Sequence, residues 1–240
     1  GLALQDEEFF DLIAHWIEMP TSQGHLSLQE IVNIGDTIRY VTDLDQYRQL
    51  LPIAKANNQL LVNTGYIYDT QIIQRISSKY PLKEFQGLTT ESFTNFLGEL
   101  TWEEEQALYD FQRKCNQVLA EFDCKVFLKK YQPNTLPALF YLSNQGERIR
   151  DMEQTKKKSS GLWGDVLGDM LSNMEQKNHS KLYLNVENAL IQKLAKNENI
   201  DLYIQLIYVN ALLMGHYPMK QEEMQLLTNN LIKLIELGIG

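Results

Sequence analysis

Hydrophobic and polar positions near the end of the chain predict two consecutive helices. Over residues 200–214, apolar side chains occupy most of the helical circumference, which is typical of a helix buried on nearly all sides. Over residues 220–237 they recur at steps of three, four and three, the spacing that lets one helix pack along another. Gly238 is expected to cap this second helix. The regularly spaced positions are Met224, Leu227, Leu231 and Leu234.

These apolar positions have two interpretations: a core within one chain, or a surface covered by a second copy. Fully burying a Leu or Ile side chain is worth roughly 1.5 to 3 kcal/mol, so leaving several exposed would cost about as much as a domain's net stability. Because a two-fold axis needs only one self-complementary patch, we predict a homodimer with a shared four-helix bundle. The expected interface residues are Leu206, Val209, Leu213, Leu227, Leu231, Leu234 and Ile235.

The first part of the chain has an acidic amphipathic start. Residues 6–18 predict a helix with one apolar face, expected to be the remainder of a larger upstream domain because the chain opens on Gly1 inside this pattern. Turn residues follow at 20–24. Ser27 is then expected to cap a short helix through residue 33, with Glu30 completing a capping box.

A strand–helix–strand–helix pattern comes next and predicts a small parallel sheet. The strands are expected at residues 37–41 and 60–63 and the helices at 46–56 and 69–78. Asp43 or Asp45 should cap the first helix, in which Pro52 should produce a kink, and Asp69 should cap the second.

A hinge between two bodies is expected at residues 87–98. Beyond it, Thr101 and Glu104 form a second capping box at the start of a long helix. Residues 125–131 and 138–143 predict two antiparallel strands joined through 132–137, and 181–185 a third. The predicted fold class is therefore α+β: a small three-layer α/β unit, then a mixed α/β domain ending in a helical dimerisation hairpin.

Residues 156–176 combine an apolar stripe at helical spacing with three glycines, each of which costs about 0.5 to 1 kcal/mol in a helix. A core helix is one interpretation. The other is an adhesive patch, because flexible Met side chains repack against varied partners. The residues that would bind such partners are Leu162, Trp163, Leu167, Met170 and Leu171.

Composition narrows the function classes. The net charge of −9, from 31 acidic and 22 basic residues, argues against nucleic acid as a partner. The longest apolar stretch, near residues 202–214, is shorter than the ~20 residues that span a bilayer, so no membrane partner is expected. The acidic residues 1–19 do not fit a signal peptide. Cys115 and Cys124 are too far apart along a helix to pair, and we expect reduced thiols in a cytoplasmic protein.

Enzyme motifs are missing from the sequence. The four histidines have neither a helical pair nor a cysteine at metal-ligand spacing, so we expect no metal site. Residues 161–168 lack the Lys-Ser/Thr ending of a phosphate loop. The stretch Asn63-Thr64-Gly65-Tyr66 could border a ligand crevice, although a tight turn is the simpler interpretation. We therefore predict no catalytic, cofactor-binding or metal-binding residue.

Several stretches resemble the heat shock protein 90 family of molecular chaperones, whose bacterial members are called HtpG. The segments LYLNVENALIQKLA (182–195), QLIYVNALLMGHYPM (205–219) and LIKLIELGIG (231–240) are similar, in this order, to the end of that family. PTSQGHLSLQEI (20–31) resembles its middle-domain linker, and residues 38–76 resemble the smaller α/β part of its middle domain. Residues 155–181 align with no family motif. The resemblance covers most of the chain after about residue 20.

The resemblance implies a part of a homodimeric, ATP-dependent chaperone of the stress response that assists protein folding and binds unfolded or partly folded clients. It implies a remnant of an upstream middle-domain helix and linker at 1–26, the small α/β part at 27–98, and a dimerisation and client-binding domain at 99–240. The family binds ATP and Mg through domains that this chain lacks, so no ATPase activity is expected here. The alternatives are a dimeric scaffold without chaperone activity and, third, a small-molecule enzyme.

Overall fold

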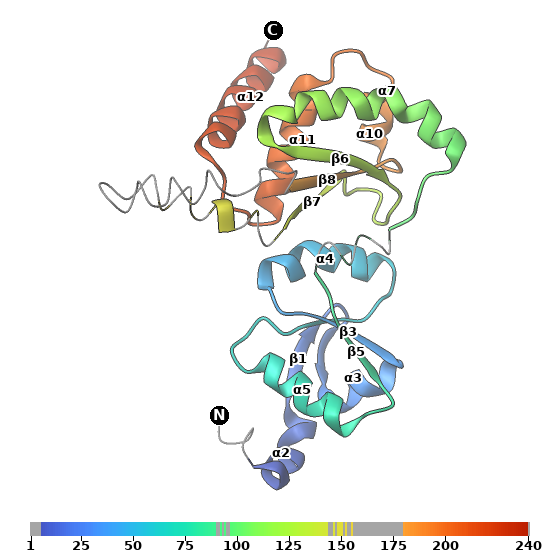
Figure 1. Cartoon of the computed structure of the whole chain (residues 1–240), viewed down its shortest axis with the longest axis vertical. Helices are drawn as coiled ribbons and strands as arrows, with labels where there is room; N and C mark the ends of the chain where they lie inside the picture. The colour runs from blue at the N-terminus through green and yellow to red at the C-terminus, as the bar shows by residue number, and fades with distance from the viewer. Residues whose placement is uncertain are drawn as a thin grey trace. The chain divides into compact units, whose positions relative to one another are not determined.

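Two mixed sheets and a C-terminal helix pair make up the computed structural model (Figure 1), which confirms the predicted mixed α/β class. The structure describes residues 6–89, 92, 94, 97–143, 146, 148–150, 152, 155 and 180–239. Its contacts divide the chain into unit 1, Gly1–Phe96, and unit 2, Leu97–Gly240. This division lies two residues before the boundary expected at 98.

The sheet of unit 1 has the strand order β2-β1-β4-β3-β5. β3 pairs in parallel with β4 and β5, whereas β1 is antiparallel to both β2 and β4. The predicted parallel pairing of the strands at 37–41 and 60–63 is confirmed, but the sheet as a whole is mixed because the turn residues near Pro20 lie in a β-hairpin. The strands are β1 (Glu18–Thr21), β2 (Gly24–Ser27), β3 (Thr37–Val41), β4 (Leu61–Asn63) and β5 (Glu84–Gly87).

Most helices of unit 1 begin at a local capping residue. Ser27 and Glu30 form the predicted capping box, and Asp43 caps the next helix by accepting from the Gln46 amide. Asp69 is instead the first residue of its helix, which has no side-chain cap. The helices are α2 (Glu7–Ile13), the 3-10 turn η1 (Ala14–Trp16), α3 (Leu28–Ile34), α4 (Leu44–Ala56) and α5 (Asp69–Lys79).

Helices cover both faces of this sheet, giving three layers. One face packs against α2, α3 and α5 in a cluster that includes Phe10, Ile31, Ile38, Val62 and Ile73. The buried residues of α4 are not in that cluster, and α4 contacts β3 and β4, so it covers the opposite face. α4 continues through Pro52 without ending there. The first helix, predicted over residues 6–18, ends at Ile13 as α2. η1 follows it, and β1 begins at Glu18.

The sheet of unit 2 has the order β6-β8-β7, with β6 (Cys124–Lys129), β7 (Ala138–Leu142) and β8 (Ser180–Asn185). β8 pairs in parallel with β6 and antiparallel with β7. The predicted pairing of the first two strands was therefore wrong, because the third strand lies between them. The buried side chain of Asn185, at the end of β8, donates to the Tyr131 carbonyl and accepts from the Tyr131 amide.

Helices α7 and α11 pack on this sheet around one core. α7 begins with the predicted capping box of Thr101 and Glu104 and buries Phe111 and Cys115. α11 contributes Ile204, Ile207, Tyr208, Val209 and Leu212 to the same cluster. The helical segments are α7 (Trp102–Val118), the 3-10 turn η2 (Ala120–Phe122), α10 (Ala189–Leu194), α11 (Asp201–Met214) and α12 (Gln221–Ile239). None of the helices that the structure describes is long and apolar enough to cross a membrane.

Candidate functional site

The last helix, α12, reverses the usual burial pattern. Its two fully buried residues are polar, Glu223 and Asn230, each 1 % exposed. Both face α11, where Tyr208 donates to Glu223 and Gln205 accepts from Asn230. These contacts run in opposite sequence directions, so the two helices are antiparallel. Every residue from 231 to 239, which we call the outer half of α12, is exposed.

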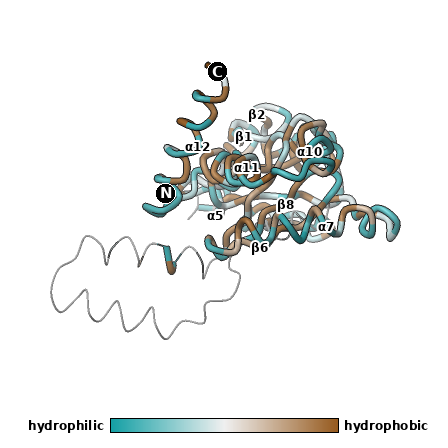
Figure 2. Tube along the Cα trace, turned by 90° about the horizontal axis from the view of Figure 1, so that it is seen from above, coloured by the Kyte–Doolittle hydropathy of each residue, from teal (hydrophilic) through white to brown (hydrophobic). Residues whose placement is uncertain are grey.

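The outer half of α12 is rich in large apolar side chains that the chain leaves in water. Their exposed fractions range from 37 % to 83 %. Figure 2 shows apolar stretches recurring along α12 towards its end. Contiguous apolar surface of this kind usually marks an interaction site. The residues are Leu231, Ile232, Leu234, Ile235, Leu237 and Ile239.

An open groove lies between the start of α11 and the outer half of α12. It has a volume of about 520 Å³ and is lined from α11 by Leu202 and Tyr203 and from α12 by Lys233 and Leu237. Asp201 also borders it. The groove adjoins the apolar surface of α12, and its lining mixes apolar with polar side chains, the latter including Asn199 and Gln205.

The structure brings together only some of the predicted interface residues. Leu231, Leu234 and Ile235 are exposed together on the outer half of α12. Leu213 is also exposed, but at the far end of α11 from the groove. Leu206 and Leu227 are half-buried, and Leu227 packs against the core of unit 2.

Two sequence-based expectations about this helix pair need correction. Val209 is 0 % exposed and belongs to the core of unit 2, so its side chain is not available to a partner. The near-continuous apolar sequence of α11 could not show which residues faced the sheet. Gly238 lies within α12, which runs to Ile239, and is not a C-cap.

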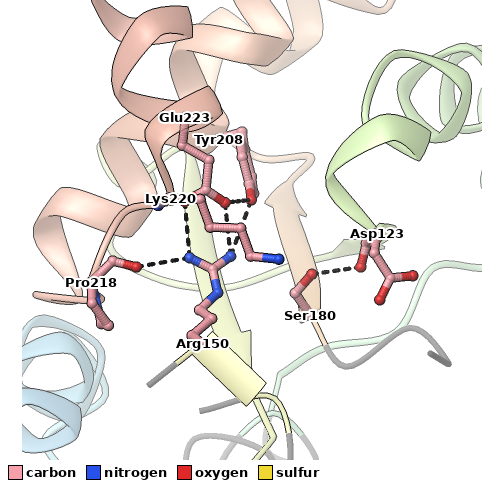
Figure 3. Close-up of polar contacts among 7 residues, drawn as sticks. All are labelled: Asp123, Arg150, Ser180, Tyr208, Pro218, Lys220 and Glu223. Carbon is pink, nitrogen blue, oxygen red and sulfur yellow. Dashed lines mark hydrogen bonds and ion pairs between the residues drawn. The ribbon is translucent and has the colours of Figure 1, made fainter. Parts of the chain in front are cut away.

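A buried ion pair lies where α12 begins (Figure 3). Both Nη atoms of Arg150 donate to the two carboxylate oxygens of Glu223, at 2.9 and 2.8 Å. Arg150 Nη1 also donates to the Pro218 carbonyl at 2.9 Å, and the Tyr208 hydroxyl donates to Glu223 at 2.5 Å. The Lys220 amide donates to the same carboxylate at 2.7 Å. We call Arg150, Tyr208 and Glu223 the anchor cluster.

Burial and charge act on this cluster together. Burial by itself lowers the pKa of the Arg150 guanidinium, but the adjacent charge of Glu223 outweighs it and raises the pKa above its usual value. For Tyr208, burial raises the pKa of the hydroxyl, and the Glu223 carboxylate raises it further. The cluster is therefore a charged arginine, a neutral phenol that donates, and a carboxylate that accepts.

Sequence reasoning missed the anchor cluster because Arg150 and Glu223 are 73 residues apart. One signal was present. Glu223 lies four residues before Leu227, which places a carboxylate on the apolar side of the predicted helix. A charge at such a position needs a buried partner.

The two cysteines, the turn at residues 63–66 and the possible metal ligands were the other candidates from the sequence. Cys115 and Cys124 are free and buried, and burial raises the pKa of each thiol to about 12, so neither is a reactive thiolate near neutral pH. Asn63 accepts from the Gly65 amide and Thr64 donates to the Val41 carbonyl, as in a tight turn. In the described parts of the chain, no group of three His, Cys, Asp or Glu residues could hold a metal ion.

The expected client-binding residues Leu162, Trp163, Leu167, Met170 and Leu171 lie outside the described residues. A scan against protein-family models and a search of curated proteins both found no match to the chain.

Proposed function

We propose that the chain forms a homodimer through the outer half of α12 and serves as the C-terminal part of a chaperone of the heat shock protein 90 type. The observation that carries this proposal is the set of exposed apolar side chains from Leu231 to Ile239. A second copy suits this surface because a two-fold axis makes each contact twice. The adjoining groove gives the partner's helix a concave place to pack.

The chaperone part of the proposal rests on the ordered resemblance of the linker, the α/β part and the terminal segments to that family. In such a protein, this chain would hold two protomers together and offer part of the surface for unfolded or partly folded clients. Residues 162–171 are proposed for that contact. The ATP and Mg of the family belong to other domains, so the isolated chain has no proposed cofactor and no ATPase activity. A cytoplasmic setting belongs to the same proposal.

An aggregation assay with an unfolded client tests the chaperone role. The wild-type chain should slow client aggregation, and Trp163→Asp/Met170→Asp should weaken this effect while leaving the dimer intact. A matched control is Trp102→Asp/Tyr109→Asp, which changes two exposed aromatic residues of α7. Unchanged suppression in the Trp163/Met170 variant would contradict the assigned client contact. A dimer that never slows aggregation would instead be a scaffold without chaperone activity.

A further inference from the structure

The inner part of α12 packs Leu226 and Leu227 against the core of unit 2, and its two fully buried residues add directed polar contacts. Glu223 and Asn230 are seven residues apart, two helical turns, and both face α11. Apolar contacts tolerate a helix that slides or rotates, because the hydrophobic effect has no direction. Hydrogen bonds between fixed atoms do not tolerate such movement. The hydrogen bonds of Glu223 and Asn230 therefore fix one rotation and one axial position of α12 against α11.

The Glu223 carboxylate accepts four hydrogen bonds. One carboxylate oxygen accepts from Arg150 Nη2 and from the Tyr208 hydroxyl, and the other accepts from Arg150 Nη1 and from the Lys220 amide. Arg150 is fixed in turn by the Pro218 carbonyl, which belongs to the turn between α11 and α12. A bidentate arginine–carboxylate pair adds geometric specificity as well as energy.

A small change in the direction of α12 at Glu223 produces a much larger displacement at the far end of the helix. Ile239 lies sixteen residues beyond Glu223, which at 1.5 Å per residue is about 24 Å. The outer half is exposed throughout, so its own unit does little to correct its direction. The position of the apolar face consequently depends on the contacts at the start of the helix.

We propose that Arg150 is a positioning residue whose ion pair with Glu223 sets the direction and rotation of α12, and thereby the face that the helix presents to a second copy. The link to the second copy rests on the homodimer proposed above. A buried ion pair is a weak source of stability, because desolvating both charges offsets most of their attraction. Its best-attested use is conformational specificity, which is the role assigned here.

The test replaces the pair by apolar residues of similar length, Arg150→Met/Glu223→Met. Spin labels on Gln117→Cys in α7 and Glu236→Cys in α12, both exposed sites in unit 2, report the direction of α12. The native cysteines are buried with pKa values raised to about 12, so they stay unlabelled. We expect a narrow distance distribution in the otherwise wild-type chain and a clearly broader one in the double variant. An unchanged distribution overturns the proposal.

Sedimentation of the unlabelled chains then measures self-association. The double variant should raise the dimer dissociation constant about tenfold, a difference of about 1.4 kcal/mol. Val126→Ala, which removes volume from the core on β6 without touching the cluster, should leave that constant unchanged. A broadened distribution with an unchanged constant overturns the link to self-association. A monomeric wild type overturns that link and the proposed dimer, whereas the distance distribution still decides the positioning role.

A second variant covers the case in which the double variant does not fold. Arg150→Lys keeps the positive charge but cannot form two parallel hydrogen bonds with Glu223. It should broaden the distribution and weaken the dimer less than the double variant. A distribution as narrow as that of the wild type would overturn the proposal, because it would show that charge alone sets the helix.

Discussion

Helices α7 and α12 belong to the same unit and have similar lengths, 17 and 19 residues, but they bury opposite kinds of residue. The buried residues of α7 are Phe111 and Cys115, whereas those of α12 are Glu223 and Asn230. α7 thus places its apolar side against its own unit. α12 is attached through buried polar residues together with the half-buried Leu226 and Leu227, and it leaves large apolar side chains exposed. Under the homodimer proposed above, α7 completes its own fold and α12 offers its apolar surface to a second copy.

The largest expected effect comes from breaking the anchor cluster on one side. Arg150→Met leaves the Glu223 carboxylate buried without its cation, which should lower the free energy of unfolding of unit 2 by about 3 to 5 kcal/mol. The matched change in α7 is Arg113→Met, where an exposed ion pair with Asp110 is lost and the cost should be below about 1 kcal/mol. Urea denaturation followed by circular dichroism measures both. Equal costs would show that α12 is not anchored by this pair.

The next effect concerns the apolar side of α12. Leu231→Asp/Ile235→Asp places two charges on the exposed face and should weaken the dimer about 100-fold, or about 2.8 kcal/mol, with little loss of monomer stability. Gln225→Asp/Asn229→Asp adds the same charge at exposed positions that precede the outer half of α12 and should have little effect on association. Sedimentation equilibrium compares the two variants. Similar weakening of the dimer in both variants would show that the contact lies elsewhere or that added negative charge alone weakens association.

The smallest effect belongs to α7, whose start depends on a local cap. Thr101 Oγ1 accepts from the Glu104 amide, so Thr101→Ala should cost about 1 kcal/mol and leave self-association unchanged. The hydrogen bond from Lys130, followed by that from the Thr101 amide, lowers the pKa of Glu104 below its ordinary 4.5. Glu104 therefore stabilises unit 2 fully above pH 4.5, and this contribution disappears as the pH falls through the lowered value.

Denaturation at several pH values checks this last prediction. Glu104→Gln keeps the shape of the cap without its charge and should flatten the acidic part of the stability profile. A profile identical to that of the wild type would show that other carboxylates account for the loss of stability in acid.

Sequence reasoning succeeded where the signals were local. The capping boxes at Ser27 and Thr101 were predicted because each needs only a residue and a carboxylate three positions later. Strand order failed because β8, some 40 residues after β7 in sequence, inserts beside it. No periodicity in either strand encodes that neighbour.

The same distinction holds for the candidate site. Of the regularly spaced positions on α12, Leu231 and Leu234 are exposed, whereas Leu227 packs against the core of unit 2. The burial of Val209 depends on how α11 lies against the sheet, which its uniformly apolar sequence does not specify. Arg150 was missed because its partner is known only once the fold brings the helical residues 148–150 beside the start of α12.

Solution mass across a dilution series tests the central claim most directly. If the outer half of α12 is covered by a second copy, the mass at high micromolar concentration should be twice the chain mass of 27.9 kDa, and it should fall towards 27.9 kDa on dilution. A folded species that stays at 27.9 kDa at every concentration would contradict the proposed homodimer.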